Sequence, residues 1–245
     1  MKPIYSTLLL VGLFACQTTE EIQERGKEQF NEVPPLIAST KPCATLYKSI
    51  MDMFYEHQNN QAEYPMLFSE NTQKNIVLTH KAKVFVSFIS EGAGFENSLG
   101  YYTYKASEGV GSKENLTLNI IFPHISETVL TKGDMVQLGT EEFEAGTVIG
   151  FFLIIRGWEN GYVNFKKNIH YTNYQFNINQ FQQHIVFKEG TCGDVVMAFE
   201  DKPLADGSDY DYNDVIFTVS DNNQQLETVN FDLTNMVLFE PTTTP

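Results

Sequence analysis

The densest group of side chains that could bind a ligand lies within residues 199–217, where acidic and amide groups gather between two apolar segments. The oxygen-bearing side chains are Glu200, Asp201, Asp206, Asp209, Asp211, Asn213 and Asp214. Two carboxylates about 4 Å apart repel by roughly 4 kcal/mol at an effective dielectric constant of about 20, so such a group needs full solvation or a counter-charge. Ca²⁺ takes roughly six to eight oxygen ligands from such side chains and from backbone carbonyls. The stretch therefore predicts a Ca²⁺ site.

The spacing within this stretch favours a metal site over an exposed acidic hairpin that only keeps a sheet edge soluble. Asp209, Asp211 and Asn213 alternate with two tyrosines, so extended backbone would place three oxygen ligands on one side and two rings on the other. The pattern is not an EF-hand, because Asp214 stands where that loop needs its sixth-position glycine and Ser220 where it needs its glutamate.

The composition suits a cation-binding protein and excludes some partners. The 245 residues include 16 Lys+Arg and 31 Asp+Glu, for a formal net charge of −15. Phosphate binding needs clustered Lys and Arg, so we expect no nucleic-acid partner. With 42% hydrophobic and 13% aromatic residues, the chain can bury a sizeable core, and it is not a disordered acidic tail.

Other chemical patterns are weaker. The five histidines form no zinc-hydrolase spacing and no Gly-x-Ser-x-Gly elbow occurs, so we expect no catalytic site. A glycosidase-type carboxylate pair stays open, because 31 acidic residues offer many pairings. Trp158, with Tyr162 nearby, is a candidate aromatic platform for sugars, although such residues more often belong to a core or to cross-strand pairs.

The N-terminus has the pattern of an export signal. Lys2 precedes an apolar run over residues 4–13, which ends in Leu13-Phe14-Ala15-Cys16. This ending resembles the bacterial lipobox. It predicts a signal peptide over residues 1–15, cleavage before Cys16 and lipidation of Cys16, which would anchor the protein to the bacterial cell envelope at the outer membrane or cell surface. The alternative is an ordinary secretory signal that contains a cysteine.

The segment between this signal and the main domain divides into a tether and a helix. Residues 16–41 are polar and predict a tether. Apolar residues at helical spacing then predict an amphipathic helix over residues 42–60, which Pro65 keeps from extending. In an oxidising compartment Cys43 and Cys192 can form a disulfide or remain two separate buried thiols.

Residues 66–240 are typical of an all-β domain. Short segments rich in Val, Ile, Phe, Thr and Tyr alternate with turn residues, without helical periods between them. The predicted strands are 75–79, 83–90, 100–105, 116–122, 134–138, 147–155, 184–188, 194–199, 214–220, 228–232 and 236–239. We expect a mainly β fold, an antiparallel β-sandwich or jelly roll with the N-terminal helix packed on it. Residues 241–245 are expected to form a disordered tail.

Motifs in a fixed order also resemble a known bacterial family. They occupy residues 83–104, 148–153, 157–158, 196–201 and 209–217. They are similar to the C-terminal domain of unknown function of LruC-type surface lipoproteins, and the resemblance covers about residues 66–220. It implies a β-sandwich with Ca²⁺ at Glu200, Asp201, Asp209, Asp211, Asn213 and Asp214. It also suggests that Glu91 and Asn97 lie near that site, and it supplies no established activity.

These observations together predict a lipid-anchored envelope protein with a calcium-stabilised β-sandwich. We expect a structural or adhesive role, or binding of a glycan or another surface protein. The alternative is a carbohydrate-active enzyme, or an accessory module of one, that uses the aromatic residues and the carboxylates.

Overall fold

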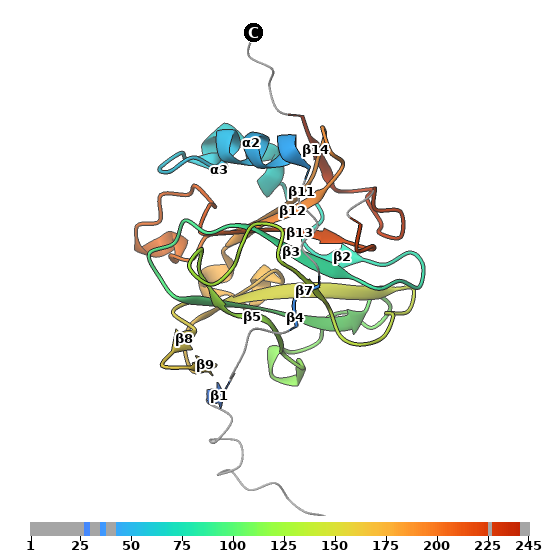
Figure 1. Ribbon diagram of the computed structural model, residues 1–245, viewed down its shortest axis with the longest axis horizontal. Helices are drawn as coiled ribbons and strands as arrows, with labels where there is room; N and C mark the ends of the chain where they lie inside the picture. The colour runs from blue at the N-terminus through green and yellow to red at the C-terminus, as the bar shows by residue number, and fades with distance from the viewer. Residues whose placement is uncertain (1–26, 30–34, 38–42, 225–226, 241–245) are drawn as a thin grey trace, which may run out of the picture.

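The computed structural model describes residues 27–29, 35–37, 43–224 and 227–240 (Figure 1). The predicted signal peptide, Cys16 and the predicted tail at 241–245 lie outside the described residues. Among the described residues, no helix is both long and apolar enough to cross a bilayer. The chain is mainly β, as predicted, and its two large sheets are stacked face to face.

One large sheet has six strands in the order β14-β11-β12-β13-β3-β6. Their bounds are β3 (Phe85–Ser90), β6 (Met135–Gln137), β11 (His184–Glu189), β12 (Val195–Phe199), β13 (Val215–Ser220) and β14 (Val237–Phe239). Neighbouring strands pair antiparallel except β11 and β14, which are parallel. The expected antiparallel arrangement therefore holds for this sheet apart from one edge pair.

The other large sheet is built around two long strands that pair along almost their whole length. Its order is β10-β7-β4-β5, and β2 also pairs with β7. The bounds are β2 (Ile76–Val77), β4 (Asn97–Lys105), β5 (Asn119–Ile125), β7 (Thr147–Ile154) and β10 (Ile169–Tyr171). Every residue of β7 is buried, because other side chains pack on both faces of this central strand.

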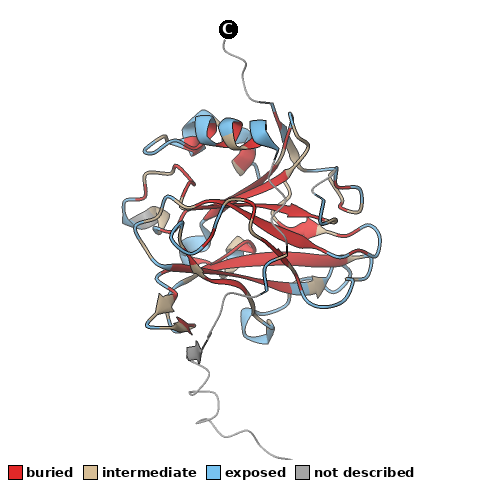
Figure 2. Ribbon diagram, viewed as in Figure 1, coloured by how far each residue is buried: buried red, intermediate tan, exposed pale blue. Residues whose placement is uncertain are grey.

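The main core fills the space between these two sheets. Phe217 of β13 packs against Phe151 of β7 with ring centroids 5.2 Å apart, and Phe88 of β3 meets Phe122 of β5 at 6.5 Å. Burial is concentrated in the facing strands, as Figure 2 shows. Contact between the inner faces of two sheets defines a β-sandwich, which confirms the predicted architecture.

A helical layer covers the outer face of the six-stranded sheet (Figure 1). Helix α2 (Ala44–Met53) buries Leu46 and Ile50 completely, in one cluster with Ile185 and Phe187 of β11. The short helix α3 (Asn60–Glu63) and the 3₁₀ helix η1 (Pro65–Phe68) follow it. Other 3₁₀ turns are η2 (Lys113–Asn115), η3 (Tyr174–Phe176), η4 (Ile178–Gln180) and η5 (Leu204–Asp206). The predicted docking of an N-terminal helix on the sheet is confirmed.

The helix is shorter than the predicted span of residues 42–60. It ends at Met53, and the Gln58 side chain donates a hydrogen bond to the Met53 carbonyl at 2.9 Å. His57 then takes a left-handed backbone conformation (φ 66°), and Asn59 caps α3 by accepting from the Ala62 N–H. The polar run over residues 56–61 therefore favours a turn, because it offers no apolar face to bury.

Two parts of the predicted tether contact the domain. Strand β1 (Lys27–Gln29) pairs with β9 (Tyr162–Asn164), which forms a hairpin with β8 (Trp158–Glu159). Ile37 donates its backbone N–H to the Met135 carbonyl at 2.8 Å. Two short segments within the predicted tether of residues 16–41 are therefore joined to the domain by backbone hydrogen bonds.

Two further features bear on the sequence predictions: a disulfide and the predicted strand over residues 228–232. A disulfide joins Cys43, just before α2, to Cys192 in the β11–β12 turn. The predicted strand over residues 228–232 is wrong, because the described residues there form only an isolated bridge between Leu78 and Phe231.

Candidate cation site

The ends of β12 and β13 bring three carboxylates together. The register pairs Phe199 with Val215, so Glu200 and Asp201 leave one strand beside Asp214, which enters the other. One carboxylate oxygen from each of these three acids lies within 4.8 Å of the others. The antiparallel pairing of two core strands therefore positions half of the predicted ligand set.

In this inner cluster, defined as Glu200, Asp201 and Asp214, two acids are buried and Asp214 is half-buried. Glu200 is 0% exposed and Asp201 is 2% exposed. Asp201 donates its backbone N–H to Asp214 Oδ2 at 2.7 Å, and Asn97 of β4 donates its side-chain amide to Asp201 Oδ2 at 2.7 Å. His170 Nε2 lies 3.1 Å from the Asp201 carbonyl oxygen. The cluster is thus held by both sheets.

Glu200 is the exception within this network. Both of its carboxylate oxygens are buried, and neither has a well-aligned hydrogen-bond partner among the described residues. The Ser208 and Asp214 side chains act as weak hydrogen-bonding neighbours that lower its pKa slightly, but burial outweighs them. Buried polar groups are nearly always hydrogen-bonded, so an orphaned carboxylate marks a place where a partner is expected.

The electrostatics of the inner cluster strongly oppose ionisation. Burial, followed by the charge of Asp211, raises the pKa of Glu200 to about 7. Burial and the charges of Asp201 and Glu200 raise the pKa of Asp214 to about 9, and burial also raises the pKa of Asp201. Since the carboxylates repel one another in a poorly solvated place, a bound cation would stabilise their ionised forms.

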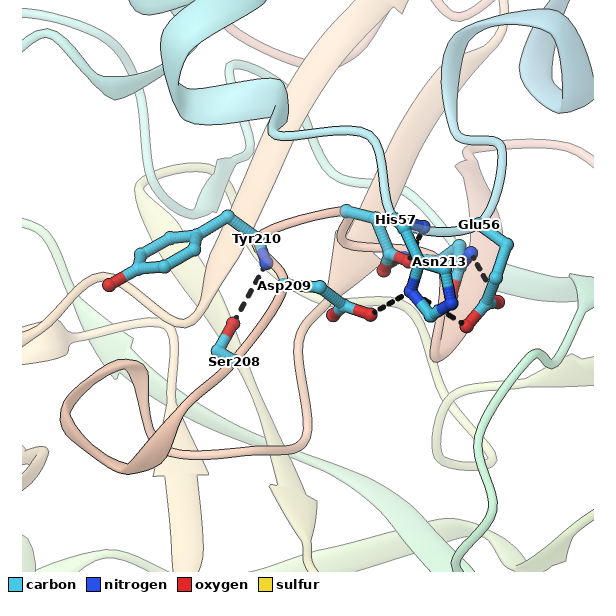
Figure 3. A network of polar contacts seen from close by, with 7 residues as sticks. Glu56, His57, Ser208, Asp209, Tyr210 and Asn213 are labelled. Atoms are coloured by element: carbon cyan, nitrogen blue, oxygen red, sulfur yellow. Dashed lines mark hydrogen bonds and ion pairs between the residues drawn. The ribbon is translucent and has the colours of Figure 1, made fainter.

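A second group, the outer cluster, forms where the loop meets the N-terminal segment. It consists of Glu56, His57, Asp209 and Asp211, whose ligand atoms also lie within 4.8 Å of one another. His57 donates its backbone N–H to Asp211 Oδ2 at 2.9 Å, and its Nδ1 lies 2.8 Å from Asp209 Oδ2 (Figure 3). The hydrogen bond to Asp209 is the main cause that raises the pKa of His57. Unlike Glu200, these acids already have polar partners.

The loop backbone does not follow the extended path predicted for the alternating residues. Tyr210 and Tyr212 have left-handed φ values of 64° and 55°, and neither belongs to a strand. Tyr212 is fully buried beneath the helical layer, and its hydroxyl donates to the Gln182 carbonyl at 3.0 Å. Asn60 of α3 donates its backbone N–H to the Tyr210 carbonyl at 2.9 Å. Contacts with the N-terminal segment therefore support these two costly conformations.

The structure divides the predicted ligand set. Asp209 and Asp211 belong to the outer cluster, and the Asn213 side chain donates to Glu56 Oε2 at 3.3 Å, beside that cluster (Figure 3). Asp206 is exposed at the end of η5 and belongs to neither cluster. The expectation of one continuous site at these positions is therefore corrected to two adjacent groups.

Two residues suggested by the family resemblance lie close to the inner cluster. Asn97 binds Asp201 directly. Glu91 is half-buried, and burial is the main cause that raises its pKa to about 7, with smaller contributions from other groups that include the charge of Asp201.

Sequence reasoning missed Glu56, His57 and His170. Their contacts with the loop span between 31 and 157 residues, and no local pattern marks them.

The structure separates the two residues of the predicted aromatic platform. The hairpin register pairs Trp158 with Val163 and Glu159 with Tyr162, so Trp158 and Tyr162 point to opposite faces. The turn between the strands, Asn160-Gly161, has positive φ at both residues, which is the usual two-residue hairpin loop. That dipeptide was the signal that could have located the hairpin.

The fold and the clusters define a β-sandwich domain with a buried carboxylate group at the ends of two core strands. Residues 143–222 match the family described as Domain of unknown function (DUF4114). The matched region runs from just before β7 to just after β13, and it contains the whole inner cluster together with Asp209 and Asp211. No curated protein and no solved structure matches the chain.

Proposed function

We propose that this chain is a cell-envelope protein whose β-sandwich is stabilised by Ca²⁺ held at Glu200, Asp201 and Asp214. The observation that supports this most directly is Glu200, whose two buried carboxylate oxygens lie beside two further acids and have no well-aligned hydrogen-bond partner among the described residues. A divalent cation would supply the missing partner and offset the repulsion within the cluster.

The donor set favours a hard cation. All side-chain ligands of the inner cluster are carboxylate oxygens, which suit Ca²⁺, Mg²⁺ or Mn²⁺ better than metals that prefer thiolate or imidazole. Ca²⁺ accepts irregular oxygen cages, whereas Mg²⁺ usually keeps several waters and binds few protein ligands. A largely buried group of three carboxylates therefore supports Ca²⁺. The outer cluster adds an imidazole and is more exposed, so it is the less favourable place for this ion.

The proposed biological role is structural, adhesive or ligand-binding at the bacterial surface. The ordered motifs of LruC-type surface lipoproteins and the lipobox-like sequence at Cys16 support this placement. Mass spectrometry of Cys16 in the membrane fraction, with and without globomycin, tests the anchor. An unmodified Cys16 would contradict lipidation without affecting the cation proposal.

Thermal unfolding tests the cation site directly. We expect millimolar Ca²⁺ to raise the melting temperature above its value in EGTA, and Asp214→Asn to remove most of that increase. Asp206→Asn is the matched control, because it removes an exposed acid from the same loop but from neither cluster. Equal melting temperatures of the unmodified protein in EGTA and Ca²⁺ would refute the proposal.

A further inference from the structure

We propose that an open groove between the β3–β4 loop and the β8–β9 hairpin binds an acidic saccharide. Arg156 would hold the anionic group of the sugar, and Trp158 would pack against its ring. This inference rests on the ligand-binding role proposed above and names its ligand class, but it does not depend on the cation site.

The groove is large enough for small sugar units. Its volume is about 470 Å³, within the range of about 300–1,000 Å³ that small-molecule sites usually have. Phe95 and Glu96 line it from the β3–β4 loop, and Arg156, Trp158 and Lys167 line it from the region around the hairpin. The groove thus combines aromatic rings from both segments with cationic side chains.

Arg156 is presented to the groove by an unusual backbone. Its φ is 53°, a left-handed conformation that costs a non-glycine residue roughly 1–2 kcal/mol. The buried Asn97 side chain accepts the Arg156 backbone N–H at 3.0 Å and holds this conformation in place. The guanidinium lies 3.9 Å from the centroid of the Phe95 ring, and its positive charge opposes part of the rise in the pKa of Asp201. An exposed, oriented guanidinium of this kind suits a carboxylate or sulfate.

Trp158 is held just as firmly. Its indole stacks on His124 with ring centroids 5.4 Å apart and an interplanar angle of 12°. Its backbone N–H donates to the Glu96 carbonyl at 3.0 Å, which links the hairpin to the β3–β4 loop. A half-buried indole offers an apolar surface of the kind that packs against the C–H face of a pyranose ring.

The remaining charges narrow the ligand class. Glu159 lies 3.8 Å from Lys167, and Glu96 lies 3.9 Å from His124, so the acids of the groove have basic neighbours. Their oxygens can accept hydrogen bonds from sugar hydroxyls, and the exposed Asn160 can both donate and accept. Those two carboxylates and the net charge of −15 disfavour a dense polyanion, while the polar lining disfavours a purely apolar ligand. A saccharide with isolated acidic groups fits best.

The chain contains a single tryptophan, so its fluorescence reports on this groove alone. We would titrate the full mature protein with hyaluronan tetrasaccharide, which alternates glucuronate with a neutral sugar, and with neutral chitotetraose. Calorimetry runs in parallel, because a bound ligand can leave the fluorescence unchanged. We expect saturable binding of the acidic probe and at least about tenfold weaker binding of the neutral one.

Arg156→Gln should lower the affinity for the acidic probe at least about tenfold. It should change the melting temperature of the protein by no more than a few degrees. Lys113→Gln is the control, because it removes the same charge from an exposed turn outside the groove. Trp158→Ala, measured by calorimetry, should also weaken binding. Affinity unchanged by Arg156→Gln, equal binding of the neutral probe, or preference for an acidic hexapeptide would overturn the proposal. Hydrolysis of the tetrasaccharide would support binding and would show that the protein is an enzyme rather than a binding module.

The groove and the cation site can fail separately. Absence of saccharide binding in a protein that Ca²⁺ still stabilises would refute only the groove. If the protein binds the acidic probe but its melting temperature does not change with Ca²⁺, only the cation site is refuted.

Discussion

Replacing Glu200 with glutamine should change the stability of the protein in opposite directions with and without Ca²⁺. The substitution keeps the shape of the side chain and removes its negative charge. Without a cation, the Glu200 carboxylate repels each ionised neighbour within 4.8 Å, by about 3.5 kcal/mol per pair at an effective dielectric constant of about 20. Glu200→Gln removes this repulsion.

Two effects reduce the gain. The raised pKa values of Asp201 and Asp214 leave part of the cluster protonated, and the new amide is itself buried without a partner, at a cost of about 1–3 kcal/mol. At pH 8.5, above the pKa of about 7 for Glu200, we therefore expect the variant to exceed the unmodified protein by about 1–3 kcal/mol in EGTA.

In the presence of Ca²⁺, the unmodified protein should become more stable than the Glu200→Gln variant. Extracellular modules commonly bind Ca²⁺ with Kd values of about 10⁻⁴–10⁻³ M, so 10 mM Ca²⁺ would add about 1.4–2.7 kcal/mol to the unmodified protein. That corresponds to a rise in melting temperature of about 3–10 °C for a domain of this size. The variant, which lacks a central ligand, should gain little.

Urea unfolding and thermal unfolding at pH 8.5 in EGTA and in Ca²⁺ measure both effects, with Asp206→Asn as the control. Two results would refute the reasoning. The first is a variant less stable than the unmodified protein in EGTA, which would show that Glu200 has a stabilising partner there. The second is a Ca²⁺ response retained in the variant, which would place any bound ion elsewhere.

The remaining predictions concern pH, the disulfide and two buried polar side chains. Because folding raises the pKa values of Glu200 and Asp214 to about 7 and about 9, the metal-free protein should lose stability as pH rises from about 5 to 9, and Ca²⁺ should flatten that decline in urea unfolding. Cys192→Ser opens a cross-link spanning 149 residues and should cost about 2–5 kcal/mol, measured by unfolding under non-reducing conditions; no loss would show that packing alone holds α2. Burial lowers the pKa of His184 to about 3, so the contribution of the neutral imidazole to the free energy of unfolding is lost as pH falls from about 6.5 toward 3. His184→Gln should therefore reduce the loss of stability over that pH range, measured by urea unfolding. Asn97→Ala should lower both the Ca²⁺-induced rise in melting temperature and the affinity for the acidic saccharide, since it removes partners of both sites; an effect on one alone would show that Asn97 supports only that site.

The sequence was most informative where a segment is buried on both faces. The predicted strands 83–90, 147–155, 194–199 and 214–220 each contain an observed strand that is fully buried, because continuous Val, Ile and Phe are stable only in such places. It was least informative for β8, β9 and β10, which have two or three residues and depend on the neighbours they pair with. Parallel pairing of β14 with β11 also has no local signal.

For the candidate site, the sequence located the loop but not its internal division. Glu200 and Asp214 could be placed beside each other because they flank two strands that follow in sequence. The separate grouping of Asp209 with His57 depends on a contact across 152 residues. The prediction of a single site assumed extended backbone, in which alternate side chains point to the same side. Tyr210 and Tyr212 have left-handed conformations, so this assumption does not hold.

These contacts suggest why the N-terminal segment and the loop belong to one stable unit. The disulfide and the buried face of α2 fix the start of that segment on the six-stranded sheet, and His57 and Asn60 then bind the loop that carries the acids. On the opposite side, Asn97 of the other sheet binds Asp201 and supports the backbone of Arg156. A cation at the inner cluster would therefore stabilise a point where both sheets and the helical layer meet. A cation bound only at the outer cluster would strengthen the contact between the N-terminal segment and the loop and leave Asn97 unaffected, so the response of Asn97→Ala separates the two locations.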